Sequence, residues 1–449
     1  MPELTLLTST YDRTHYPHRS FVQCHPDRLA IVAMLAGVDT ADIRTARVLE
    51  IGCGTGGNLL PMAVQLPRAR FTGIDLSSSQ IQRARDIASA CSITNVELVP
   101  TSIEAFDADD GSFDYVLCHG VFSWVGHDTQ QAILRSISRL LRPSGAAFVS
   151  HNTLPGWRDR QIVRDLALRV LDTADFSAEL ADAEQLRDLL IEELSRLIAS
   201  VGDGDPQYRS RLMAELARLN EVDAAYVVHE HFAPVSNPCS VARFARMAEA
   251  HGLCFVGDAN PHLFAVSAAA PSDLRGSLAE RISAHEWFDL VHLTSFRQSV
   301  LVRSDARCAG SVEPTKVLER VTVASSLIPP DDINLSQPSS SLFQSARGVV
   351  TFVEPIVKAA FIELFLAAPR ALFVSELLAR ARTRLGRVEP SDESTLVDEL
   401  LALVHETDLI GFTRTKVLRE PVGARLSVRA PVHALAVRAW SSTDESLAS

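Results

Sequence analysis

The stretch RVLEIGCGTGGNLLP, residues 47–61, decides the fold of this chain. A short apolar run leads to Glu50, and three glycines follow at alternate positions, Gly52, Gly54 and Gly56. Glycines in a loop between a strand and a helix let the backbone approach a bound nucleotide closely. The stretch therefore predicts a buried strand, a nucleotide-binding loop and the start of a helix.

Apolar strand patterns alternate with helical patterns from residue 26 to residue 150. The helical segment SSSQIQRARDIASA (77–90) begins with a serine that is suited to cap it, and QQAILRSISRLLRPSG (130–145) is amphipathic. Such alternation predicts an α/β fold with a parallel sheet and right-handed crossovers. The strand patterns are ARVLEIG (46–52), ARFTGIDL (69–76), NVELVPTS (95–102), FDYVLCHG (113–120) and AAFVSHNT (146–153).

The glycines alone leave the nucleotide open, because with Gly57 they satisfy both the dinucleotide pattern G-x-G-x-x-G and the G-x-G-x-G of S-adenosylmethionine binders. Glu50 separates the two classes. A carboxylate beside the loop repels a pyrophosphate but attracts the ammonium and sulfonium of S-adenosylmethionine. Asp75 ends the second strand pattern, where a carboxylate accepts the ribose hydroxyls in either class. Together the acids favour S-adenosylmethionine.

Composition argues against several classes of protein. The 449 residues carry 43 Lys and Arg against 55 Asp and Glu, and the net charge of −12 is a poor match for nucleic acid. The seven cysteines form no CxxC pair, and His229 and His231 lack zinc-helix spacing, so we expect neither disulfides nor a metal site. No leader pattern is visible and no apolar run reaches about 18 residues, so we expect a cytoplasmic protein without membrane contact.

The strand pattern stops after residue 156. Residues 157–222 predict helices, and the polar, proline-rich stretch SSLIPPDDINLSQPSSS (325–341) predicts a linker. Helices followed by DLIGFTRTK (408–416) resemble a winged helix. The helix expected at 392–408 contains six acidic residues and no Lys or Arg, which is the wrong charge for the major groove of DNA. We therefore expect this part of the chain to contact protein or a second copy.

Several segments together resemble a known family. VLEIGCGTGGN (48–58), GIDLSSSQI (73–81) and FDYVLCHGVFSWV (113–125) resemble the core of class I S-adenosylmethionine-dependent methyltransferases. The flanks YDRTHYPHRSFVQCHPDRLA (11–30) and SHNTLPGW (150–157) resemble bacterial members with a methyltransferase regulatory domain, among them the rickettsial outer-membrane-protein lysine methyltransferases. Two positions differ from that group. Cys24 stands where the group usually has Thr, and His151 stands where it often has Tyr.

The resemblance implies a Rossmann-like methyltransferase core with added helical, α+β and winged-helix-like domains. The expected division is an N-terminal lid (1–26), the cofactor-binding core (27–156), a helical middle and regulatory-type domain (157–310), a linker (311–345) and a winged-helix-like C-terminal domain (346–449).

Strand ends and the resemblance together suggest the site residues. His119 is expected to face both the sulfonium and the methyl acceptor. Trp124 is expected to wall a slot for an aliphatic chain, with cation–π attraction to an ammonium. The residues expected to bind the cofactor are Glu50, Gly52, Gly54, Gly56, Asn58, Asp75, Leu76, Thr101, Ser102, Ile103 and His119. The candidates to guide a proton from the acceptor are Tyr16, His25, His119 and Asn152.

The implied reaction is an in-line methyl transfer, which depends mainly on positioning and exclusion of water. The first expectation for the acceptor is a lysine amine of a protein. A small molecule or peptide intermediate, methylated at N, O or C, remains the alternative within methyltransferases. From other classes, an NAD-dependent oxidoreductase and a non-catalytic S-adenosylmethionine sensor also remain open.

Overall fold

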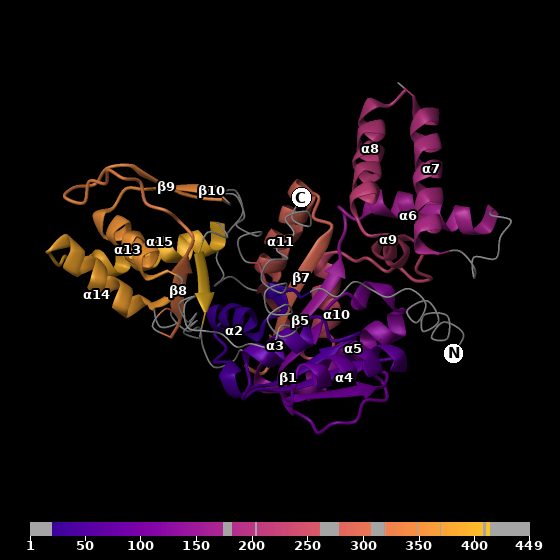
Figure 1. Cartoon of the computed structure of the whole chain (residues 1–449), viewed down its shortest axis with the longest axis horizontal. Helices are drawn as coiled ribbons and strands as arrows, with labels where there is room; N and C mark the ends of the chain where they lie inside the picture. The colour runs from indigo at the N-terminus through magenta and orange to yellow at the C-terminus, as the bar shows by residue number, and fades with distance from the viewer. Residues whose placement is uncertain are drawn as a thin grey trace.

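A computed structural model of the chain describes residues 20–173, 182–202, 204–260, 278–306, 318, 320–346, 348–368, 370–406 and 410–413. A central α/β body carries a helical extension on one side and a C-terminal body of helices and short strands on the other (Figure 1). Tyr16 and the rest of the expected lid up to residue 19 lie outside the described residues, as do residues 414–449.

The central body is built on a seven-stranded sheet with the order β3-β2-β1-β4-β5-β7-β6. All five strands expected before residue 156 are present and run parallel, and β7 is antiparallel to both of its neighbours. The strands are β1 (Arg47–Ile51), β2 (Arg70–Asp75), β3 (Val96–Pro100), β4 (Phe113–Cys118), β5 (Leu141–Asn152), β6 (Leu253–Asp258) and β7 (Phe296–Arg303).

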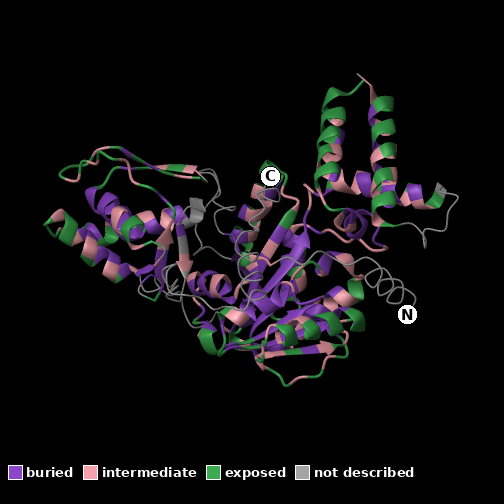
Figure 2. Ribbon diagram, viewed as in Figure 1, coloured by how far each residue is buried: buried purple, intermediate pink, exposed green. Residues whose placement is uncertain are grey.

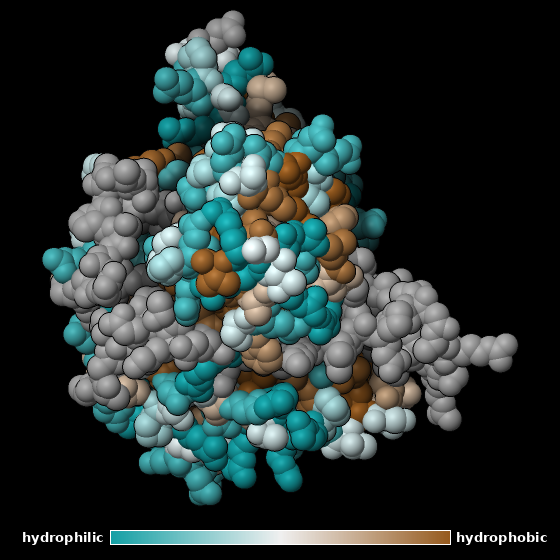
Figure 3. All heavy atoms as spheres, turned by 90° about the vertical axis from the view of Figure 1, so that its left-hand side faces the viewer, coloured by the Kyte–Doolittle hydropathy of each residue, from teal (hydrophilic) through white to brown (hydrophobic). Residues whose placement is uncertain are grey.

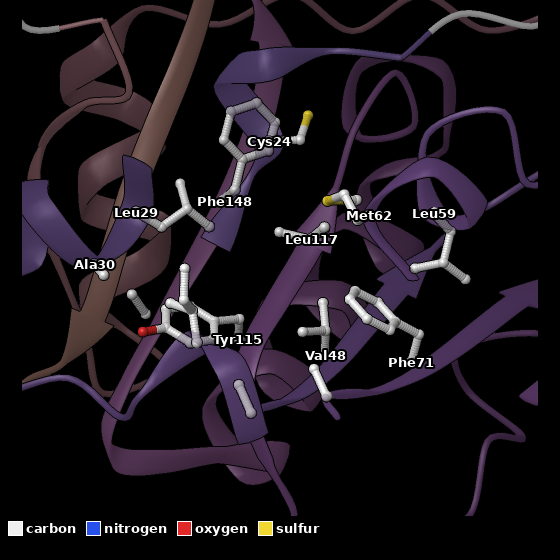
Figure 4. Packing of buried hydrophobic residues seen from close by; sticks show 14 of the residues in the cluster. Cys24, Leu29, Ala30, Val48, Leu59, Met62, Phe71, Tyr115, Leu117 and Phe148 are labelled. Carbon is white, nitrogen blue, oxygen red and sulfur yellow. The ribbon is translucent and has the colours of Figure 1, made fainter. Parts of the chain in front are cut away.

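Helices cover both faces of this sheet, because side chains alternate between the faces along each strand. Val48 and Phe71 pack with α2 (Pro26–Leu35), α3 (Leu59–Gln65) and α4 (Ser78–Ala90) on one face (Figure 4). Their neighbours Leu49 and Ile74 pack on the other face with α5 (His127–Leu140) and α10 (Val241–Glu249). In Figure 2 the strands accordingly form the buried centre of this body.

Strands β6 and β7 correct the expected extent of the sheet. They come from the segment 157–310, which sequence assigned to a separate region, yet they complete the core sheet along β5. The turn after α11 (Leu278–His292) lies on the loop after β5, where the Gly156 nitrogen donates to the Thr294 carbonyl oxygen at 3.2 Å. Short strand patterns do not reveal which distant strand they pair with, so the pairing of β7 with β5 could not be predicted from the sequence.

The helices expected between residues 157 and 222 form the extension. Leu186, Leu190, Leu194 and Ile198 are buried in its core, at the helical spacing seen in the sequence. The extension contains α6 (Arg158–Thr173), α7 (Ala183–Val201), α8 (Pro206–Glu221) and α9 (Ala224–His231).

The C-terminal body differs from its expected outline. Residues 311–345 do not serve simply as a linker, because β8 is the centre of a sheet with the order β11-β8-β12, and β9 pairs with β10. Strand β8 has only four residues, two of them polar, and it precedes a proline-rich stretch, so no strand pattern was visible there. Ile31 of α2 belongs to the apolar cluster of the C-terminal body, so this cluster joins the C-terminal body to the central body. Its elements are β8 (Thr322–Ser325), β9 (Ser341–Ser345), β10 (Gly348–Phe352), α13 (Pro355–Ala367), β11 (Leu372–Phe373), α14 (Val374–Leu385), α15 (Asp392–Glu406) and β12 (Ile410–Thr413).

Apolar atoms remain visible among polar ones on the face that carries the C-terminal body (Figure 3). The exposed apolar residues of the C-terminal body include Leu342 and Val349 of the β9–β10 pair and Leu366 of α13. Within the described residues, no helix is both long and apolar enough to cross a membrane.

Candidate cofactor and acceptor site

The glycine loop after β1 has a backbone that only glycine adopts readily. Gly52, Gly54 and Gly56 have φ angles of +72°, +51° and +77°. A Cβ atom at Gly52 would lie 2.3 Å from Cγ2 of Val121, and one at Gly56 would lie 2.9 Å from Cγ of Leu60. The loop therefore packs closely against both α3 and the segment after β4.

Asp75, at the end of β2, is held against this loop. Its Oδ2 accepts from the Gly54 nitrogen at 2.8 Å, and its Oδ1 accepts from the Ser77 nitrogen at 2.9 Å. The neighbouring Leu76 side chain is 42% exposed, on the outer side of the same edge. The carboxylate is thus fixed where β1 and β2 both end.

The three residues after β3 lie beside Asp75. The Thr101 nitrogen donates to the main-chain oxygen of Asp75 at 2.9 Å. Ser102 Oγ accepts from the Ala105 nitrogen at 3.2 Å, so this hydroxyl serves a local turn. Ile103 is buried in the cluster below the sheet edge.

Glu50 is a buried carboxyl group with one partner. Asn58 Nδ2 donates to Glu50 Oε1 at 2.7 Å, whereas Oε2 is buried and has no hydrogen-bond partner within the described part of the chain. Burial raises the pKa of Glu50 to about 8; the hydrogen bond from Asn58 lowers it and nearby Asp75 raises it further. An unsatisfied buried carboxyl oxygen favours a positively charged or hydrogen-bonding ligand at this position.

His119 follows β4 and lies among aromatic rings. Its ring centroid is 4.0 Å from that of Phe21, 5.9 Å from that of Phe148 and 6.2 Å from that of Phe296. The residue is half-buried, and its Nδ1 atom is buried without a partner within the described residues. Burial lowers the pKa of His119 to about 4, so the imidazole is neutral near pH 7.

Asn152 ends β5, the strand next to β4, and is buried. Its Nδ2 has no partner among the described residues, although its main chain is fixed: the nitrogen donates to Ser123 Oγ at 2.8 Å, and the oxygen accepts from the Cys239 nitrogen at 3.1 Å. Asn152 also pairs across the sheet with Phe296. The side chain is therefore held on the same sheet edge as His119.

The other two described candidates lie at the margins. His25 Nδ1 accepts from the Asp27 nitrogen at 3.2 Å and caps α2, and burial lowers the pKa of His25. Trp124 ends the short 3-10 helix η3 (Phe122–Trp124), and its ring meets that of Trp157 edge to face with 6.1 Å between the ring centroids.

The structure brings the ends of β1, β2, β4 and β5 to one edge of the sheet, and the expected site residues of the described part of the chain lie at or near this edge.

Comparisons with known proteins show which family this chain belongs to. Residues 48–145 match a family model described as a methyltransferase domain, and residues 223–303 match one described as a predicted methyltransferase regulatory domain. An uncharacterized protein of Rickettsia prowazekii is 33% identical over 240 residues, which cover 54% of this chain and 94% of that protein. The chain is a methyltransferase of the family that carries this regulatory domain.

The structure of PKMT2 from Rickettsia typhi in complex with AdoHcy is similar to this methyltransferase, with a TM-score of 0.74 and 25% identity over 89% of this chain and 78% of that one. A second uncharacterized Rickettsia prowazekii protein is 25% identical over 92% of this chain and 75% of its own length. Ubiquinone biosynthesis O-methyltransferase of Xanthomonas oryzae is 37% identical over 110 residues, only 24% of this chain and 44% of that enzyme.

The methyltransferase is S-adenosylmethionine-dependent, and its residues fit this cofactor. The left-handed glycine loop leaves the backbone open, and the unsatisfied Glu50 Oε2 suits the ammonium of an amino acid. The match of residues 48–145 to a methyltransferase domain and the similarity to an AdoHcy-bound structure show that the oxidoreductase alternative is wrong.

Phe21 and Phe296 contact the His119 ring, but neither residue is among the site residues expected from the sequence. Phe21 lies within an N-terminal segment that is rich in aromatic residues, and this richness could have pointed to Phe21 as a site residue. Phe296 comes from β7, and nothing in its local sequence points to His119.

His229 and His231 do not form part of this edge. Burial lowers the pKa of His231 to about 4, and its Nε2 lies 3.0 Å from an Arg218 nitrogen. The neighbouring Glu230 pairs with Arg218 at 3.2 Å and with Arg160 at 3.6 Å, so this cluster is an ion-pair network under α8 and α9. In the part of the chain that the structure describes, no group of three or more His, Cys, Asp or Glu could hold a metal ion.

Proposed function

We propose that this enzyme methylates the side-chain amine of a lysine in a protein. The observation that carries the proposal is the similarity to PKMT2, which extends over 89% of this chain, far beyond the methyltransferase domain at residues 48–145. A shared core alone would support only shared cofactor chemistry. Similarity that also includes the flanking regions supports a shared class of acceptor.

The cofactor-binding roles follow the geometry of the sheet edge. Glu50 binds the ammonium, the loop glycines lie along the methionine moiety, and Asp75 accepts the ribose hydroxyls. Leu76, Thr101, Ser102 and Ile103 surround the adenine. Asn58 bonds Glu50 Oε1 and the Phe21 nitrogen through its amide, and it is also proposed to contact the methionine end of the cofactor, because an amide nitrogen carries two N–H groups.

The acceptor side combines an aromatic wall with neutral hydrogen-bonding groups. The bound cofactor supplies a methyl group on a positively charged sulfur that is already a good leaving group. A neutral His119 accepts a hydrogen bond from the lysine amine and orients its lone pair, with Asn152 beside it. Because the pKa of His119 is only about 4, the imidazole is a poor store for the released proton, which passes to water. The rings of Phe21, Phe296 and Trp124 border the slot for the alkyl chain.

Beyond the catalytic edge, the described part of the expected lid, residues 20–26, is proposed to exclude water over the acceptor. The three C-terminal helices and β12 have the order of a winged helix. We propose that this domain contacts protein rather than DNA, because the first turn of α15 exposes Glu393, while its neighbour Asp392 is buried in an ion pair with Arg382.

The test is transfer of a labelled methyl group from S-adenosylmethionine to host lysate, separated into protein and small-molecule fractions. We expect label in protein, released on hydrolysis as methyl-lysine, and at least about tenfold less label with Asp75→Ala when the cofactor is below saturation. Label confined to the small-molecule fraction would overturn the proposal in favour of a small-molecule acceptor. The similarity to ubiquinone biosynthesis O-methyltransferase, limited to 24% of this chain, is the observation that favours this second candidate.

A further inference from the structure

The side chain of Asn58 connects the cofactor end of the site to the N-terminal segment. Its Nδ2 donates to Glu50 Oε1 at 2.7 Å, and its Oδ1 accepts from the Phe21 nitrogen at 3.0 Å. Asn58 stands directly before α3, where asparagine commonly caps a helix, but here its side chain makes no capping bond. Both polar atoms of this 7%-exposed residue therefore serve long-range contacts.

The segment that Asn58 holds covers the acceptor side. Phe21 places its ring 4.0 Å from the His119 ring. The short 3-10 helix η1 (Val22–Cys24) follows, and Cys24 is fully buried at the same end of the cluster as Phe148 (Figure 4). His25 then begins α2 as its cap. Residues 20–25 thus lie between the cofactor loop and His119.

We propose that Asn58 is a positioning residue that couples cofactor occupancy at Glu50 to closure of residues 20–25 over His119. The proposal rests on the proposed cofactor role of Glu50, and it adds a link between the two halves of the site. A bound cofactor would then order the acceptor wall before the acceptor enters.

The charge on Glu50 supplies the coupling. Without a positive partner, its raised pKa of about 8 keeps Glu50 largely protonated at pH 7. An ammonium at the unsatisfied Oε2 favours the carboxylate, and a carboxylate at Oε1 is the stronger acceptor for Asn58 Nδ2. This fixes the amide with Oδ1 toward Phe21, because a flipped amide would turn its NH₂ group onto the Phe21 nitrogen.

Alkylation of Cys24 reports this closure in the full-length protein. Cys24 is 0% exposed, so iodoacetamide reaches it only when residues 20–25 open, and Cys254, 5% exposed on β6, serves as an internal reference in the same peptide-mass experiment. With saturating AdoHcy, we expect alkylation of Cys24 relative to Cys254 to slow at least about tenfold, the effect of one charge-assisted hydrogen bond. In Asn58→Ala the slowing should fall below about twofold.

Asn95→Ala is the matched control. Asn95 Nδ2 donates to the main-chain oxygens of Ala63, Leu66 and Ala69 around the far end of α3, away from the Asn58 contacts with Glu50 and Phe21. This variant should keep the full effect of AdoHcy. Asn58→Leu, which keeps the branched arrangement of heavy atoms and removes the hydrogen-bonding groups, replaces Asn58→Ala if the latter does not unfold cooperatively.

Equal slowing in the wild type and in the Asn58 variant that folds would overturn the proposal. Calorimetry on the same samples separates the possible failures. If AdoHcy does not bind, the cofactor role of Glu50 fails and the coupling fails with it. If AdoHcy binds without slowing Cys24 alkylation in the wild type, only the coupling fails. Because no acceptor is added, the result is independent of whether lysine is the acceptor.

Discussion

A single buried carboxyl group makes cofactor binding depend on pH. Glu50 has a pKa of about 8 without a cation and would be ionised beside an ammonium, so binding of AdoHcy should release close to one proton near pH 6.5. Affinity should therefore rise about tenfold per pH unit between pH 6 and 7. Calorimetry in buffers of different ionisation enthalpy counts the protons. Glu50→Gln is the control, and equal proton release from this variant would contradict the assignment to Glu50.

The same residue affects the stability of the cofactor-free protein. The folded-state pKa of Glu50 is raised, so its contribution is fully present below the unfolded pKa of about 4.3 and is lost as pH rises through about 8. We expect Glu50→Gln to unfold at a higher temperature than the wild type at pH 8, with the difference shrinking toward pH 5. Thermal denaturation at the two pH values checks this. A constant difference would mean that the gain is unrelated to ionisation.

Asp75 should contribute directly to affinity for the cofactor. Asp75→Ala removes the proposed acceptor of two ribose hydroxyls, and each hydrogen bond to a charged group contributes roughly 1.5–3 kcal/mol. Affinity for AdoHcy should fall at least about tenfold in calorimetry. Since the Gly54 nitrogen also loses its partner, circular dichroism should accompany the measurement. Unchanged affinity would remove Asp75 from the site.

At the scale of elements, the glycine loop and the segment after β4 must fit each other. Gly52→Ala meets Val121 at 2.3 Å, and its φ of +72° is strained for alanine. Gly120→Ala carries similar strain at +68° but has no atom within 4 Å, which makes it the matched control. We expect urea unfolding to show a loss of about 1–2 kcal/mol for Gly120→Ala, and about 1–3 kcal/mol more for Gly52→Ala. Equal losses would mean that the loop and Val121 move apart freely.

Elements with local signals were predictable, and contacts between distant elements were not. Ser77 caps α4 through the Gln80 nitrogen, and Glu50 lies next to the last residue of strand β1, both as the sequence indicates. The partners of Asn58 and the ring contact of Phe296 with His119 depend on tertiary packing, which no local pattern records. The polar ends of the strands could therefore be found from sequence, but the links between them could not.

At the scale of the whole molecule, the core should not fold without its last two strands. A fragment of residues 1–156 lacks β6 and β7, whose buried residues include Phe255, Val300 and Leu301. We expect this fragment to show no cooperative unfolding transition, and a fragment of residues 1–306 to show one and to bind AdoHcy. Calorimetric scanning checks both. Cooperative unfolding of the shorter fragment would show that β6 and β7 are dispensable.

The position of β7 in the chain also has a consequence during protein synthesis. The edge of β5 is complete at Asn152, but its partner begins only at Phe296. On the order of 140 residues are translated between the two strands. At ~5–20 residues per second, the edge of β5 therefore stays unpaired for roughly 7–30 s before β7 is synthesised. During that time the helical extension can fold from its own contacts, whereas an unpaired strand edge can recruit another nascent chain. The yield of soluble enzyme should therefore depend on the spacing of ribosomes along the message, and dense translation should favour aggregates joined at β5.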